Sequence, residues 1–216
     1  MDIGQWIAII LSALLGASYV VGAMINRRRG VATYQWLRAG LEQIGKISEA
    51  KWIGSSGSGA RLVVGSAKKP FRRIEVIFLL ESREIMPIWL FNRLRNKQDE
   101  MIFKANLKQV PVQEVESGPS GDRKIRGFLS TQGVNLNPFE TVSAPDGFGI
   151  IRRGGQDEEL LAALREFLQK YRASVFQFSL RRQSPHLILR AKLPSLRENP
   201  AEELFTDLST LLSTAQ

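Results

Sequence analysis

The sequence predicts an α+β protein in which a single N-terminal transmembrane helix precedes a mainly antiparallel sheet packed with helices. Residues 3–25 form an uncharged apolar run. Beyond residue 48, short β-rich segments separated by turn residues predict hairpins, and two amphipathic segments in the last third predict helices. Hairpins mixed with helices in this way are typical of helices packed on an antiparallel sheet.

We expect three parts along the chain. Residues 1–29 form a transmembrane anchor with its stop-transfer arginines, residues 30–47 form a juxtamembrane amphipathic helix, and residues 48–216 form a cytoplasmic α+β domain. The composition of residues 117–155 shifts to Gly, Pro, Ser and Asn, so an internal boundary of the domain would fall there.

The anchor is long enough to cross a bilayer without other segments. About 20 apolar residues in a helix cover the hydrocarbon core of roughly 30 Å. A cleaved signal peptide is the alternative, but Asp2 stands where a basic residue is expected, and the run is longer than usual. Arg27, Arg28 and Arg29 follow at once, so the positive-inside rule predicts an external N-terminus, a cytoplasmic domain and contact of these arginines with anionic headgroups in the cell membrane.

Small residues recur at four-residue spacing within the apolar run, as Ser12 with Gly16 and Ser18 with Gly22. This spacing allows a second helix to approach closely, from another copy of the chain in a homodimer or from a different membrane protein. The alternative is that such residues are simply common in transmembrane helices.

The juxtamembrane helix has one apolar face. We expect it either to pack on the domain or to lie on the membrane surface with Trp36 at headgroup level. The residues of this face are Val31, Tyr34, Leu37, Leu41 and Ile44.

The remaining elements follow from apolar periodicity and turn residues. A helix from Asp157 to about residue 172 is capped by the Asp157 side chain, and Asn199, Pro200 and Glu202 predict the start of another helix. Residues 54–59 are a Gly/Ser-rich hairpin loop that fits no phosphate-binding pattern. The expected strands are residues 49–53, 60–66, 71–81, 101–107, 125–131, 149–153, 174–182 and 186–193.

Residues 85–97 combine bulky apolar residues with a basic tail. In one interpretation this segment contacts the membrane or a partner, with Trp89 and Phe91 among the headgroups and Arg93 and Arg95 on phosphates. In the other, a short helix after Pro87 covers the sheet. The residues that it would bury in the core are Ile88, Leu90, Phe91 and Leu94.

The composition excludes several chemistries. The chain has no cysteine, which excludes disulfides, thiolate metal sites and cysteine nucleophiles. His186 is the only histidine, so a His-rich metal site is excluded, and nothing around it indicates a catalytic triad. We therefore expect no metal, no cofactor and no catalytic residue.

The formal net charge is +9, and every basic residue lies at or beyond Arg27. In a domain tethered to a bilayer, this balance favours anionic lipid headgroups as partners. We expect no nucleic acid partner, because the chain has neither a recognition helix nor an aromatic motif on a sheet.

Together these features predict a non-enzymatic interaction or accessory domain at the membrane face. A lipid-binding or lipid-handling domain is the first alternative, which a deep apolar pocket beside the bilayer would favour. An enzyme with a site built from scattered carboxylates and arginines is the second, which a polar cleft with perturbed carboxyl pKa values would favour.

Overall fold

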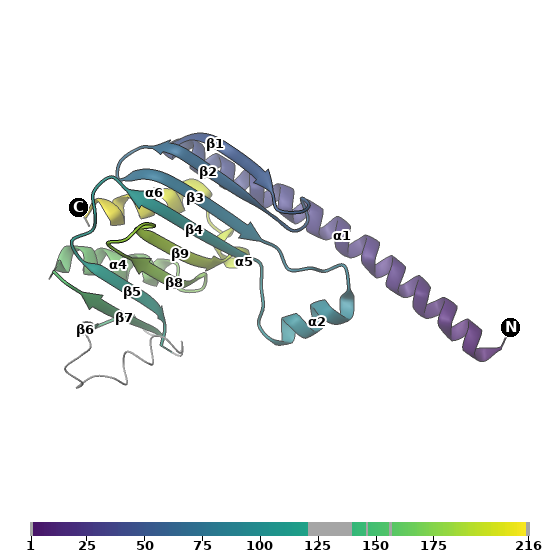
Figure 1. Cartoon of the computed structure of the whole chain (residues 1–216). Coiled ribbons are helices and arrows are strands. Elements are labelled where there is room, and N and C mark those ends of the chain that lie inside the picture. The colour runs from purple at the N-terminus through teal and green to yellow at the C-terminus, as the bar shows by residue number, and fades with distance from the viewer. Residues whose placement is uncertain (1, 121–139, 146, 156, 215–216) are drawn as a thin grey trace.

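The structure, a computed structural model, describes residues 2–120, 140–145, 147–155 and 157–214. The fold is α+β, as predicted. A long apolar N-terminal helix projects from a large antiparallel sheet, and the remaining helices lie around that sheet (Figure 1). The strand expected at residues 125–131 lies outside the described residues.

The described residues form one sheet of nine strands in the order β1-β2-β3-β4-β9-β8-β5-β7-β6. The helices are α1 (Ile3–Ile44), α2 (Met86–Leu94), α4 (Glu158–Lys170), α5 (Leu193–Leu196) and α6 (Ala201–Ser213). The strands are β1 (Gly45–Trp52), β2 (Gly59–Ala67), β3 (Phe71–Leu79), β4 (Glu100–Leu107), β5 (Glu114–Pro119), β6 (Glu140–Val142), β7 (Phe148–Arg153), β8 (Val175–Leu180) and β9 (Leu187–Lys192).

The sheet continues across the composition shift at residues 117–155. β5 pairs with β8 on one side and with β7 on the other, both antiparallel. The strands that flank this region therefore share one sheet, and backbone hydrogen bonds link them to the rest of the domain.

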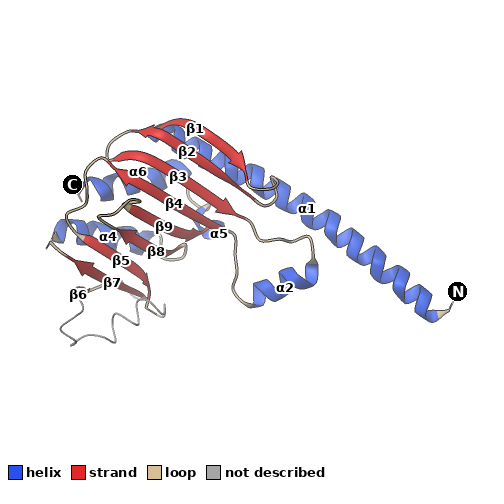
Figure 2. Cartoon of the chain, in the orientation of Figure 1, coloured by secondary structure: helices blue, strands red, loops and turns tan. Residues whose placement is uncertain are grey.

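Helices cover one face of the sheet, and the opposite face is open (Figure 2). Strand β4 shows the reason, because its residues alternate between full burial and partial exposure. The ring of Phe103 on its buried side lies 5.9 Å from that of Phe71 and 5.7 Å from that of Phe205 on α6. The core thus lies between the sheet and the layer formed by α4, α6 and the second half of α1.

The second half of α1 belongs to this layer. Leu37 and Leu41 are fully buried, and a Cβ on Gly40 would lie 2.5 Å from the Phe205 ring, so α1 and α6 pack with little space between them. The Trp36 indole donates to the Asn199 carbonyl oxygen at 3.0 Å. The packing alternative for this helix is therefore correct, and the placement of Trp36 among headgroups is wrong. The helix ends at Ile44, before residue 47, because the chain enters β1 at Gly45.

One helix start follows the prediction and the other differs. The Asp157 carboxylate accepts from the Leu160 amide at 3.0 Å and caps α4. Helix α6 instead begins at Ala201 with Pro200 as its N-cap and no side-chain cap. Asn199 lies one position too early to cap it.

Replacing Phe205 with Ala should lower the free energy of unfolding by about 3–5 kcal/mol, because the substitution leaves a cavity where α1, α6 and β4 meet. The matched control is Thr206→Ala on the exposed side of the same helix, with an expected change within about 0.5 kcal/mol. Denaturant unfolding of the full chain in detergent, followed by circular dichroism, measures both. Equal effects of the two substitutions would contradict this packing.

Candidate membrane-proximal site

The first half of α1 is exposed and apolar. Among the described residues, α1 is the one helix long and apolar enough to cross a membrane, and only 6% of its most apolar stretch is buried. This low burial distinguishes it from the core helix of a soluble protein. Its length and composition are consistent with a transmembrane or a signal helix near the N-terminus.

Three glycines let the domain contact α1 closely where its apolar run ends. A Cβ on Gly22 would overlap the carbonyl oxygen of Arg83, and one on Gly30 would overlap that of Ser56. A Cβ on Gly57 would lie 3.3 Å from the Asn26 Cβ. The Gly/Ser-rich loop at residues 54–59 therefore packs on α1, as does the chain just before α2.

A buried polar cluster holds the same part of α1. The Asn26 amide donates to the Glu81 carbonyl oxygen at 2.9 Å, and its Oδ1 accepts from Arg83 Nη1 at 2.8 Å. Asp99 accepts from Arg83 Nη2 at 3.0 and 2.9 Å and from the Glu81 amide at 2.8 Å. Arg29 completes the cluster with a 3.4 Å ion pair to Asp99. We call these five residues the junction cluster.

Asp99 is the centre of the junction cluster. Its side chain is 4% exposed, and that of Arg83 is 12% exposed. A charge buried this deeply is tolerated only when it is paired and hydrogen-bonded, and Asp99 has both kinds of partner. The three predicted arginines therefore differ, because Arg29 enters this cluster whereas Arg27 and Arg28 are exposed beside it.

The Glu81 side chain is the exception in the junction cluster. Among the described residues, neither of its carboxyl oxygens has a hydrogen-bond partner, although both are covered from solvent. Burial raises the pKa of Glu81, and the positive charge of Arg83 opposes this rise.

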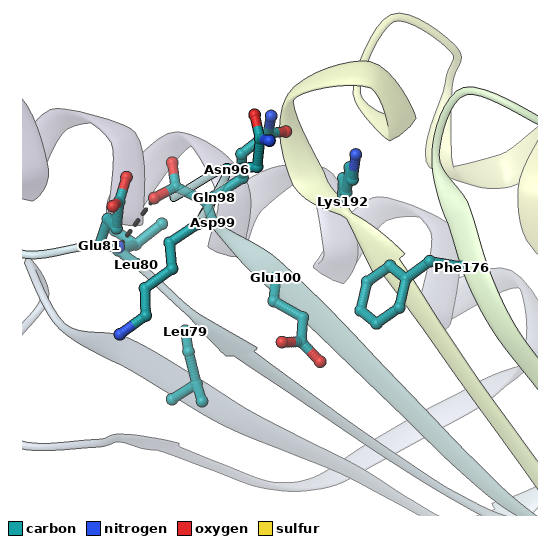
Figure 3. Close-up of a pocket in the computed structure, with 10 residues that line it drawn as sticks. Leu79, Leu80, Glu81, Asn96, Gln98, Asp99, Glu100, Phe176 and Lys192 are labelled. Carbon is teal, nitrogen blue, oxygen red and sulfur yellow. Dashed lines mark hydrogen bonds between the residues drawn. The ribbon is translucent and has the colours of Figure 1, made fainter. Parts of the chain in front are cut away.

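Glu81 and Asp99 line one end of a groove of about 570 Å³, with Phe176 and Lys192 towards its other end (Figure 3). A polar cleft with a perturbed carboxyl group is the feature that an enzyme would show, but the surface of this groove is mostly apolar. Its other carboxylates are engaged, since Asp99 pairs with Arg83, and Glu100 with Arg190. His186 lies elsewhere, where its Nδ1 accepts from the Leu107 amide at 3.0 Å.

Helix α2 is exposed, so the interpretation that it covers the sheet is wrong. None of its residues is buried, because α1, α4 and α6 already cover the sheet and α2 lies beyond the end of β3 and β4 (Figure 1). The large apolar residues exposed on and next to this helix are Ile85, Met86, Ile88, Leu90, Phe91 and Leu94.

The predicted contact residues of α2 lie on different sides of the helix. Phe91 and Arg93 are exposed, and the Arg95 guanidinium lies over the Phe91 ring, 5.1 Å from its centroid. Trp89 is partly covered and lines an apolar groove with Met86 and α1. Arg93, Arg95 and Phe91 are thus available to contact a membrane or a partner, whereas Trp89 faces α1 of its own chain.

The small residues of α1 are also divided. Ser18 and Gly22 line the groove between α1 and α2. Gly16 has open space beside it, and Ser12 is exposed. Packing of a second helix on Ser12 and Gly16 stays a prediction, whereas Gly22 already contacts its own chain.

No protein-family model matches the chain, and no curated protein matches it either.

Replacing Asp99 with Asn should lower the free energy of unfolding by about 3 kcal/mol, because Arg83 would stay buried without its counter-charge. Glu42→Gln is the control, since it removes an exposed ion pair to Arg38 on the same helix α1 and should cause no resolvable loss. Denaturant unfolding of the full chain measures both. Similar small losses would show that the junction cluster does not hold the helix.

Glu81→Gln should remove a pH dependence of stability. Because burial raises the pKa of Glu81, the folded chain holds this proton more tightly than the unfolded chain. The contribution of protonated Glu81 to the free energy of unfolding is complete below its pKa in the unfolded chain. This contribution is lost as pH rises through its pKa in the folded chain. The free energy of unfolding of the wild type should therefore fall relative to the variant between mildly acidic and neutral pH. Parallel profiles in denaturant titrations across this range would contradict the burial of the carboxyl group.

Proposed function

We propose that the chain is a single-pass membrane protein whose cytoplasmic α+β domain is a non-enzymatic interaction or accessory module, held at the membrane face by two contacts. The first contact is the apolar half of α1, and the second is α2. The main support for this proposal is that no residue of α2 is buried, and that its apolar side chains other than Trp89 are exposed beside the apolar half of α1.

The level of α2 along α1 supports a membrane contact. Met86 and Trp89 share a groove with α1 residues between Leu14 and Ile25. At 1.5 Å per residue, that stretch covers about 16 Å of the helix axis. If α1 crosses the bilayer, α2 lies within the leaflet next to the domain, where its apolar residues leave water and each buried leucine or phenylalanine contributes about 1.5–3 kcal/mol.

The charges near α2 agree with this placement. Arg93 and Arg95 lie at the C-terminal end of α2, and Lys97 follows them. Arg27 and Arg28 are exposed on α1 just beyond the apolar run. Basic side chains at this level would meet headgroup phosphates, and the positive-inside rule then assigns the domain to the cytoplasm and the short N-terminus to the other side.

The open face of the sheet supports an interaction role rather than catalysis. Its charged side chains pair across neighbouring strands, as Arg61 does with Glu75 at 2.7 Å and Arg181 with Glu116 at 2.9 Å. Such pairs leave a rigid, mixed polar and apolar surface. Two membrane contacts would present this surface at a fixed angle to the bilayer, where a membrane-bound protein partner could reach it.

The absence of cysteine allows a direct test on the full chain, because an introduced cysteine is the only thiol. We expect an environment-sensitive dye on Leu90→Cys to emit as in an apolar medium when the chain is reconstituted in vesicles, and to be quenched by spin-labelled lipid. Leu90 is exposed on α2, so in water the same dye would emit as an aqueous one.

The control label is on Ser66→Cys, which is exposed and pairs with Lys46 at the start of β1. This position adjoins the buried end of α1, so its dye should report water and resist quenching by lipid. An aqueous spectrum at both positions would reject the second membrane contact.

A further inference from the structure

The groove between α1 and α2 is an apolar site of about 350 Å³ that the two-contact proposal does not by itself require. Most of its lining residues lie on α1, and the others lie on α2 and the segment before it. It falls in the size range of small-molecule sites, about 300–1,000 Å³. Its lining residues are Leu14, Ala17, Ser18, Val21, Gly22, Ile25, Arg83, Met86 and Trp89.

The level of the groove determines what can fill it. Every α1 residue that lines it belongs to the uncharged run that would lie in the bilayer. Water in an apolar groove at that depth would lack hydrogen-bond partners. The small residues Ala17 and Gly22 leave this space open.

A second helix could place side chains in the groove but could not enter it as a whole. A helix about 10 Å across and about 16 Å long occupies on the order of 1,000 Å³, well above the space present. A single hydrocarbon chain is much narrower, so the dimensions favour lipid over the α1 helix of another copy.

Arg28 lies on α1 just beyond Ile25, the last α1 residue of the groove, and it is free to bind an anion. Leu14, Val21 and Arg28 are spaced seven residues apart and share one face of α1. Among the described residues Arg28 has no ion-pair partner, whereas Arg29 and Arg83 are held by Asp99. An anionic group above an acyl chain in the groove would therefore meet Arg28.

We propose that the groove binds one acyl chain of an anionic bilayer phospholipid, with the lipid phosphate on Arg28. This inference rests on the proposed function, because it requires that α1 cross the membrane and that α2 lie in the leaflet next to the domain. It adds a defined lipid site to a general attraction for anionic membranes.

Native mass spectrometry of the full chain in detergent, with phosphatidylglycerol or phosphatidylcholine of identical acyl chains added, tests the headgroup. Arg28→Gln should weaken phosphatidylglycerol binding about fivefold and phosphatidylcholine binding much less, because the choline cation already offsets the charge of the phosphatidylcholine phosphate. Arg27→Gln removes the same charge from another face of α1 and should have little effect. Equal losses of phosphatidylglycerol binding in the two variants would show that the lipid is attracted only by the general positive charge of this region, and would overturn the proposal.

A second pair of variants tests the acyl chain. Ala17→Phe fills the groove and should reduce binding of both lipids, whereas Gly16→Phe adds the same ring where nothing lies within 4 Å and should preserve binding. Retention of lipid by Ala17→Phe would overturn the proposal. So would a dimer of the wild type that Ala17→Phe dissociates, since a second copy would then occupy the groove.

The dye on Leu90→Cys distinguishes failure of the lipid site from failure of the membrane contact of α2. If that dye reports a membrane environment but lipid binding is unchanged in both pairs of variants, only the lipid site is rejected. An aqueous signal would reject the second membrane contact and the lipid site together.

Discussion

The buried carboxylate of Asp99 is the constraint on which the other features depend. It joins Arg83 from the β3–α2 connection to Arg29 from α1, and it receives the backbone amide of Glu81. Removal of Asp99 or Arg83 would leave a buried charge unpaired, so the segments that carry them have one favourable arrangement. Buried ion pairs add little net stability compared with apolar packing, and their main contribution here is to specify the geometry.

The arrangement of α1 and the β3–α2 connection also sets the position of α2. Gly22 and Gly30 allow backbone from two different loops to contact α1, and the loop residue at the first of them, Arg83, lies just before α2. Helix α1 is one element of 42 residues, so its exposed half continues the direction of its buried half. The position of α2 beside the apolar half of α1 follows from the junction cluster and these glycines rather than from α2 itself, whose side chains are all outside the core.

The elements in which apolar residues recur at a regular spacing could be predicted from the sequence. Alternation in β4 and the apolar stripe of α4 each identified both the element and its buried face. Strand β5 was missed because Gly118 and Pro119 weaken its strand signal, and its pairing with β7 and β8 depends on distant residues. The exposure of α2 could not be predicted, since an apolar segment has the same sequence pattern against a core as in an interface.

The residues of the site were predicted only in part. Arg29 was found through the arginine run, but Asp99 and Arg83 lie on either side of α2 and meet only because β3 and β4 pair next to them. Two weak signals were available. Asn26 is a polar residue between the apolar run and the arginines, and the glycines of residues 54–59 fit no ligand motif. Both indicate close packing at the end of the anchor, but only the structure shows which residues contact each other there.

The junction cluster should make the anchor and the domain move as one rigid body within the bilayer. Pulsed electron paramagnetic resonance on the full chain in lipid tests it most directly, with spin labels on cysteines at Gly16, where α1 is open, and at Thr206 on the exposed side of α6. We expect a single narrow distance distribution that broadens when Asp99 is replaced by Asn. A broad distribution in the wild type would show that the chain bends between residues 26 and 30, and would contradict the account.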